Sequence, residues 1–165
     1  MQPVPGPRPQ QQTRVIPGAS GSIYTADELG NSISAIDLAT GEVETVAVAI
    51  SPHNVQTTAD GRALLAVGQL AAPAGADPHG HGAAESEGLL LLLDPLNLSG
   101  GPIASIEVGG HPAHVVADET GARAFVTLSD EDAVAVVDLA THAVAQTIET
   151  GKYPHGLRIS PDGET

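Results

Sequence analysis

Three histidines follow prolines at recurring places in this chain and are its strongest candidates for chemistry. His53 and His155 each come directly after a proline, whereas His114 comes two positions after another proline, one place later than the repeat would put it. Neutral imidazole is a common ligand of copper and zinc, so histidines repeated in this way could share one ion if the fold brings them together. The sequence therefore predicts a copper or zinc site at His53, His114 and His155.

A second pair, His79 and His81, lies in the stretch Asp77-Pro78-His79-Gly80-His81, with Glu85 and Glu87 close behind. Two imidazoles with nearby carboxylates can chelate a transition metal weakly. The alternative is a solvated loop, which the Gly- and Ala-rich composition of the stretch favours. His79 and His81 are therefore the weaker metal candidates.

The elements that must position these residues are short strands. Runs rich in Val, Ala, Ile, Leu and Thr alternate with turns rich in Gly, Asp and Ser, which is typical of strands joined in hairpins. The run Leu89–Leu93 is apolar at every position, as in a strand that is buried on both faces. The expected strands are 22–26, 32–37, 43–48, 54–57, 63–68, 89–93, 104–108, 114–117, 124–127, 133–138, 144–148 and 155–159.

The strands belong to a repeat of roughly 40 residues with four strands each, which is the pattern of β-propeller blades. AIDLATGEV at 35–43, for example, matches VVDLATHAV at 136–144. The predicted fold is all-β: a β-propeller of about three four-stranded blades in an incomplete ring. The expected blades are 21–50, which lacks its first strand, then 51–109 and 110–151, with the start of another at 152–165.

Two segments fall outside this pattern. Residues 1–20 are rich in Pro and Gln and predict a tail or linker. The blade 51–109 is longer than its neighbour, and the excess fits an inserted loop at 71–88.

The patterns Pro-His-x-hydrophobic, Asp-Gly-Arg and Ile-Asp-x-x-Thr-Gly resemble the YVTN-type β-propeller repeats, which are similar to the propellers of cytochrome d1 and nitrous-oxide reductase. Residues 21–165 all fit this resemblance. It implies an exported or surface protein, periplasmic or extracellular. The start of the chain shows no apolar signal core, so no signal peptide is predicted within it.

The resemblance also bears on the histidines. In nitrous-oxide reductase a copper cluster is held by histidines in the propeller channel, and the first strand of each blade lies beside that channel. This chain departs from a regular pattern because Ala113 stands where the other repeats have His53 and His155. The alternative is a structural Pro-His turn whose ring bonds a backbone carbonyl between blades.

Composition excludes several classes of function. The net charge is −14 and the chain has six Lys and Arg residues in no basic patch, so a nucleic-acid partner is not expected. No cysteine is present, which excludes disulfides and thiolate ligands, and no apolar run is long enough to span a membrane.

Three functions remain open. The first is a non-enzymatic binding or interaction module, with a protein or small-molecule ligand. The second is a metal- or cofactor-bearing redox propeller. The third is a lactonase-like hydrolase, which would need a catalytic Glu and Arg facing the channel. Arg62 and Arg123 follow turns, and the sequence does not place either residue there.

Three aspartates at the ends of strands are expected to have a structural role. Asp37, Asp94 and Asp138 end equivalent strands, where an Asp side chain accepts backbone N–H bonds of the turn.

An arc of three blades leaves open blade edges and apolar faces, so we expect self-association. Either the chain is part of a propeller with more blades, or two copies complete a ring.

Overall fold

The computed structural model describes residues 17–71 and 87–160. These residues form an all-β protein, in which the only helical turns are three short 3₁₀ segments. No helix in the described part of the chain is long and apolar enough to cross a bilayer.

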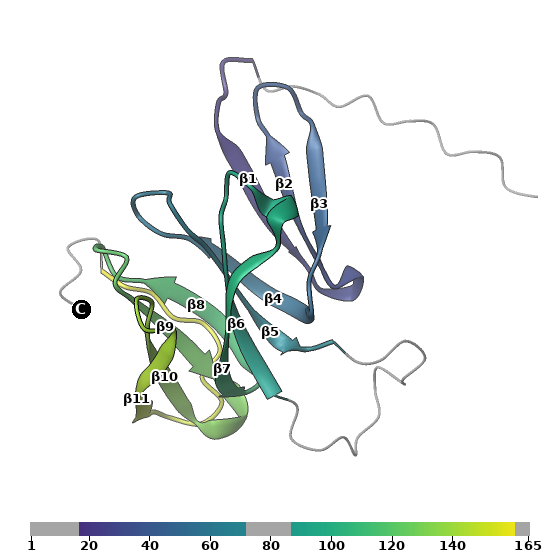
Figure 1. Cartoon of the computed structure of the whole chain (residues 1–165). Coiled ribbons are helices and arrows are strands. Elements are labelled where there is room, and N and C mark those ends of the chain that lie inside the picture. The colour runs from purple at the N-terminus through teal and green to yellow at the C-terminus, as the bar shows by residue number, and fades with distance from the viewer. Residues whose placement is uncertain (1–16, 72–86, 161–165) are drawn as a thin grey trace, which may run out of the picture.

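The strands form three antiparallel sheets that follow one another along the chain and lie side by side in Figure 1. The first sheet has three strands: β1 (Ser22–Asp27), β2 (Ser32–Asp37) and β3 (Val43–Ala47). The second sheet has four: β4 (Ile50–Thr57), β5 (Leu64–Leu70), β6 (Glu87–Leu93) and β7 (Pro102–Gly110). The third also has four: β8 (Pro112–Ala117), β9 (Arg123–Leu128), β10 (Ala133–Asp138) and β11 (Ala143–Glu149).

Within each sheet every strand pairs with the next one in the chain, as in a propeller blade. The all-β propeller architecture expected from the repeats is thus confirmed, with three blade-like sheets. The described sheets do not close a ring: they form an arc in which the second sheet packs between the first and the third (Figure 1).

The turns use the carboxylates that the sequence singled out. Asp37 Oδ1 accepts the backbone N–H groups of Ala39 and Thr40 at 2.9 and 2.7 Å. Asp138 repeats this arrangement in the third sheet, and Asp94 accepts the N–H of Leu96 at 2.8 Å. The bond from the Thr40 N–H is the main reason why the pKa of Asp37 lies below its usual value. The structural role expected for the three aspartates is confirmed.

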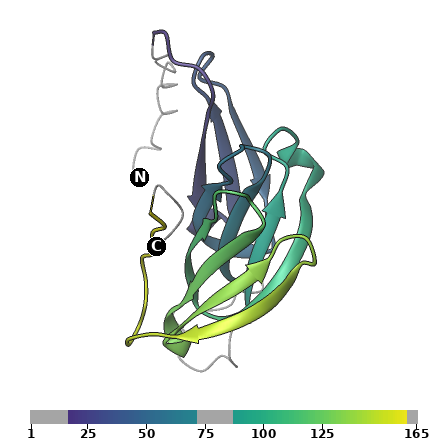
Figure 2. The ribbon, with the colours of Figure 1, turned by 90° about the vertical axis from the view of Figure 1, so that its left-hand side faces the viewer.

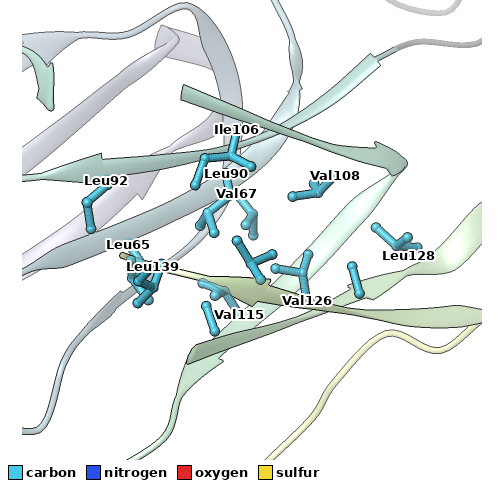
Figure 3. Packing of buried hydrophobic residues seen from close by; sticks show 13 residues of the cluster. Leu65, Val67, Leu90, Leu92, Ile106, Val108, Val115, Val126, Leu128 and Leu139 are labelled. Carbon is cyan, nitrogen blue, oxygen red and sulfur yellow. The ribbon is translucent and has the colours of Figure 1, made fainter. Parts of the chain in front are cut away.

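The second sheet is the centre of the core because it is covered on both faces. Leu89, Leu91 and Leu93 of β6 pack toward the first sheet, in a cluster with Ile33 and Ile50. Leu90 and Leu92 point the other way and pack against side chains of the third sheet, including Val115, Val126 and Leu128 (Figure 3). The continuous apolar run in β6 therefore serves two clusters, as expected.

The open face of the first sheet is only partly the apolar face that we expected. Thr25, Asp27, Ser34 and Thr45 form a chain of side-chain hydrogen bonds there, with Ser34 Oγ donating to Asp27 at 2.6 Å. At the matching places of the third sheet, side chains such as Val126 and Leu128 pack on the second sheet. Ile23, Ile36 and Val43 lie opposite one another on this same face, and Ile23 and Val43 are exposed, so the face is polar at one end of the sheet and apolar at the other.

Two predicted boundaries need correction. Glu87 and Gly88 belong to β6, where Gly88 pairs with Gln69, so the inserted loop is shorter than 71–88. The strand expected at 155–159 is not formed. After β11 the chain runs as a coil without a strand partner (Figure 2), because no described strand lies on its free side to complete a ladder. The tail up to residue 16 and the loop candidates His79 and His81 lie outside the described residues.

We predict that Leu91→Ala destabilises the protein by about 2–5 kcal/mol, because Leu91 is fully buried and its removal leaves a cavity between the first two sheets. The measurement is urea unfolding followed by circular dichroism. Leu96→Ala is the matched control, since Leu96 is 94% exposed and should lose little. Equal unfolding midpoints for the two variants would contradict a core centred on the second sheet.

Candidate metal centre

Bulges in the inner strands set the directions of His53 and His114. The ladder between β4 and β5 shifts register between Pro52 and Asn54, so His53 has no residue opposite it. The ladder between β8 and β9 shifts at the same repeat position, between Pro112 and Val115. A bulge places two consecutive residues against one, which re-aims their side chains. This explains how His114, one place later in its repeat than His53, can still reach the same spot.

Proline suits these places, because β4 and β8 are the first strands of their sheets and pair on one side only. Pro52 lies opposite Gly68 of β5, where the two backbones approach closely. A Cβ atom at Gly68 would overlap the Ser51 carbonyl oxygen and crowd Pro52. The absence of a side chain at Gly68 therefore lets the Pro52-His53 turn sit tightly on its sheet.

His155 is held by side chains of the third sheet in place of a strand partner. Thr127, which is 1% exposed, donates its hydroxyl to the His155 carbonyl at 2.7 Å and accepts the His114 N–H at 3.0 Å. Ser129 donates to the Pro154 carbonyl at 2.7 Å. Asp132 accepts the Tyr153 N–H at 2.8 Å. Thr127 thus links the backbone of two of the three candidate histidines.

The three imidazoles converge. The ring centroids of His155 lie 5.0 Å from those of both His53 and His114, and the His53 and His114 centroids are 5.6 Å apart. One ring nitrogen from each residue can be chosen so that all three lie within 4.8 Å of one another. His53 and His114 are half-buried and His155 is exposed, so the cluster is open to solvent on one side.

The structural alternative for His53 is also present. Its Nδ1 lies 2.9 Å from the Ala113 carbonyl oxygen in the neighbouring sheet. Because a carbonyl only accepts, this bond requires a proton on Nδ1 and leaves the Nε2 lone pair free. Metal-bound histidines commonly hold their second nitrogen in this way. The Pro-His turn and a metal-ligand role for His53 are therefore compatible.

His114 is suited to remaining neutral. Burial is the main cause that holds the pKa of His114 below the usual value, and electrostatic repulsion from His155, His53 and Arg158 acts in the same direction. A neutral imidazole is the form that binds a metal ion, so the pocket favours the competent state of this ligand.

A cavity of about 380 Å³ adjoins the cluster on the side of His114. Asn54, Gln56 and Arg158 contribute its polar groups, and Asn54 also accepts the Val115 N–H at 3.1 Å across the two sheets. Arg62, by contrast, lies 3.7 Å from Asp60 in an exposed turn, and Arg123 begins β9 at the end away from His114. Neither of these two arginines lines the cavity.

Sequence reasoning identified the three histidines but missed the residues that place them. Thr127 and Ser129 look like ordinary strand residues, and nothing in their types signals a bond to a segment beyond the sheet. Arg158 was not singled out, although it lies three positions after His155. His79 and His81, the weaker candidates, lie outside the described residues.

Neither a protein-family model nor a curated protein matches this chain. Among solved structures it is similar to Kuenenia stuttgartiensis hydrazine synthase, with a TM-score of 0.70 and 26% identity over 87% of this chain and 37% of that chain. It is also similar to a putative 6-phosphogluconolactonase from Bacteroides fragilis NCTC 9343, with a TM-score of 0.55 and 20% identity over 78% of this chain and 36% of that chain.

A third similar structure is a putative 6-phosphogluconolactonase from Bacteroides uniformis ATCC 8492, with a TM-score of 0.55 and 18% identity over 79% of this chain and 38% of that chain. This chain thus spans between 36% and 38% of the length of the three proteins. These likenesses agree with a part of a propeller-like fold.

We predict that Thr127→Val destabilises the protein by about 1–3 kcal/mol, because the buried His114 N–H and the His155 carbonyl lose their partner. The side chain keeps nearly the same shape, so packing changes little. Urea unfolding measures the loss. Thr147→Val on the exposed strand β11 is the control and should be near neutral. If Thr127→Val is as stable as that control, Thr127 does not anchor the cluster.

We also predict a pH dependence from His114. Its pKa is lowered in the folded state, so the unfolded chain binds more protons as the pH falls below the ordinary value of 6.5. Its contribution to stability is complete above 6.5 and is lost as the pH falls toward the lower pKa of the folded protein.

The variant His114→Gln tests this dependence. Just below pH 6.5 the free energy of unfolding should change less steeply with pH in this variant than in the parent protein. His142→Asn, in an exposed turn, should keep the parent slope. Parallel curves for all three proteins would show that His114 does not contribute.

Proposed function

We propose that this chain is the metal-binding part of a β-propeller and holds one zinc or copper ion through His53, His114 and His155. The observation that carries the proposal is the convergence of three imidazoles from two inner strands and one coil segment. Both metals favour imidazole nitrogen. A site of three histidines leaves at least one coordination position for water or another ligand.

The distances allow such a site with modest movement. Three nitrogens around an ion at ~2.0–2.1 Å lie roughly 3.3–3.6 Å apart. The ring nitrogens now lie within 4.8 Å of one another, so the most distant of them must come closer by up to roughly 1.2–1.5 Å. His155 is exposed, so its ring can turn without repacking the core, whereas His53 keeps its bond to Ala113.

The proposal is for binding and not for a reaction. The resemblance to YVTN-type propellers would further place the protein outside the cytoplasm. The resemblance to nitrous-oxide reductase would give a bound copper ion a redox role. Lactone hydrolysis receives no specific support, because the two putative lactonases are 20% and 18% identical to the chain and carry a fold argument alone. The residues that line the cavity also include no carboxylate to act as a base.

We predict that replacing any one of the three histidines with Gln weakens Zn²⁺ binding by at least ~10–100-fold. A loss of this size is typical even when the residue removed only hydrogen-bonds to a metal ligand, so loss of a ligand itself should cost no less. Isothermal titration calorimetry measures the affinity. Zn²⁺ at about 100 times its dissociation constant should also stabilise the parent protein by about 2.7 kcal/mol.

Two controls separate this site from other histidines. His142→Asn should bind Zn²⁺ as the parent does. The double variant His79→Gln/His81→Gln tests the loop candidates, and it too should bind as the parent does. A parent protein without Zn²⁺ or Cu²⁺ binding would defeat the proposal, and binding that depends only on His79 and His81 would move the site to the loop.

A further inference from the structure

We propose that the metal centre takes a small oxyanion, a carboxylate or phosphate group, which bridges the bound ion and the guanidinium of Arg158. This inference rests on the proposed metal site. It names the class of ligand that would fill the open coordination position.

The charge distribution around the cluster is the first argument. The chain has a net charge of −14, yet Arg158, one of its six Lys and Arg residues, lines the cavity beside His114. Asp and Glu are absent from the residues that line this cavity. Among the described residues, no carboxylate forms an ion pair with Arg158. Arg158 therefore brings a positive charge without an ion-pair partner in the described part of the chain to the border of this cavity, in a protein that is otherwise strongly acidic.

The closeness of Arg158 to the histidines is the second argument. Arg158 and His114 line the same cavity, to which Gly156 and Leu157, just before Arg158, also contribute. Arg158 is also close to the cluster along the chain, because it follows His155 by three residues. The carbonyls of Pro154 and His155 are held by Ser129 and Thr127, so the chain leads to Arg158 from an anchored point.

The chemistry of the ligand follows from the groups that are present. A divalent ion accepts an oxygen donor in its open position, and a guanidinium binds a carboxylate or phosphate through two parallel N–H bonds. A small oxyanion can satisfy both with different oxygen atoms. Asn54 also lines the cavity, and its NH₂ group can serve as a donor while its carbonyl oxygen accepts the Val115 N–H.

Arg158 should have opposite effects on the binding of the metal ion and on the binding of the anion, and this difference can be tested. A fixed positive charge disfavours binding of a dication and favours binding of an anion. Removing it should leave metal affinity equal or higher, while anion affinity falls. A merely damaged site would lose both affinities together.

The experiment uses Co²⁺ as a spectroscopic probe of the full chain, titrated at constant ionic strength with acetate and, separately, with inorganic phosphate. The visible spectrum of the Co²⁺ protein should change on saturation with at least one of them. In Arg158→Gln the apparent dissociation constant for that anion should rise by about 5-fold or more, the lower end of typical coupling between sites. The Co²⁺ affinity should not fall.

Arg62→Gln is the matched control, since Arg62 lies in an exposed turn outside the cavity, and it should bind the anion as the parent does. Response to acetate alone identifies a carboxylate ligand, response to phosphate alone a phosphate ligand, and response to both a general oxyanion site. Co²⁺ binding without any effect of either anion, or equal anion affinity in Arg158→Gln and Arg62→Gln, overturns the inference but leaves the metal site intact. Failure of Co²⁺, Zn²⁺ and Cu²⁺ to bind at all defeats the proposed function as well.

Discussion

The inner strands β4 and β8 are edge strands, and the need to satisfy their unpaired backbone groups organises the region around the histidines. Pro52 and Pro112 remove one donor each. His53 and Asn54 then bond the Ala113 carbonyl and the Val115 N–H across the sheets. The same side chains that satisfy the backbone therefore hold neighbouring sheets together, and they bring His53 close to His114.

The position of His155 also depends on satisfying backbone polar groups, here in a coil segment. Residues 152–160 have no strand partner, so their carbonyls must find other donors. Thr127 and Ser129 supply them from β9 and the turn that follows it. Because Thr127 also accepts the His114 N–H, a change at this buried hydroxyl would alter two corners of the cluster at once.

The hydrophobic core and the histidine cluster require different kinds of side chain. Packing between sheets needs continuous apolar faces, and β6 supplies two of them through alternate leucines. The cluster needs polar groups at the inner edge, where burial is only partial and His155 is exposed. Among the described residues, no Asp or Glu lines the cavity beside His114, so this part of the inner edge can carry Arg158 in a protein with a net charge of −14.

The fold was predictable because its signals are local. Alternation within short runs, Asp residues after strands and the apolar run Leu89–Leu93 each depend on neighbours in the chain, and they marked eleven of the twelve expected strands. The strand expected at 155–159 failed for the opposite reason, since a strand exists only when another backbone pairs with it.

The sequence by itself determined the repeat, the sheets and the three histidines as candidates. Only the tertiary structure decided that His114 joins His53 and His155 despite its shifted place, because a bulge in β8 and bonds from Thr127 set its direction. It also decided which arginine lies at the cluster: Arg158 lines the cavity and Arg62 does not. Such pairings join residues far apart in the chain, and their geometry follows from how whole sheets pack and not from any pattern of neighbouring residues.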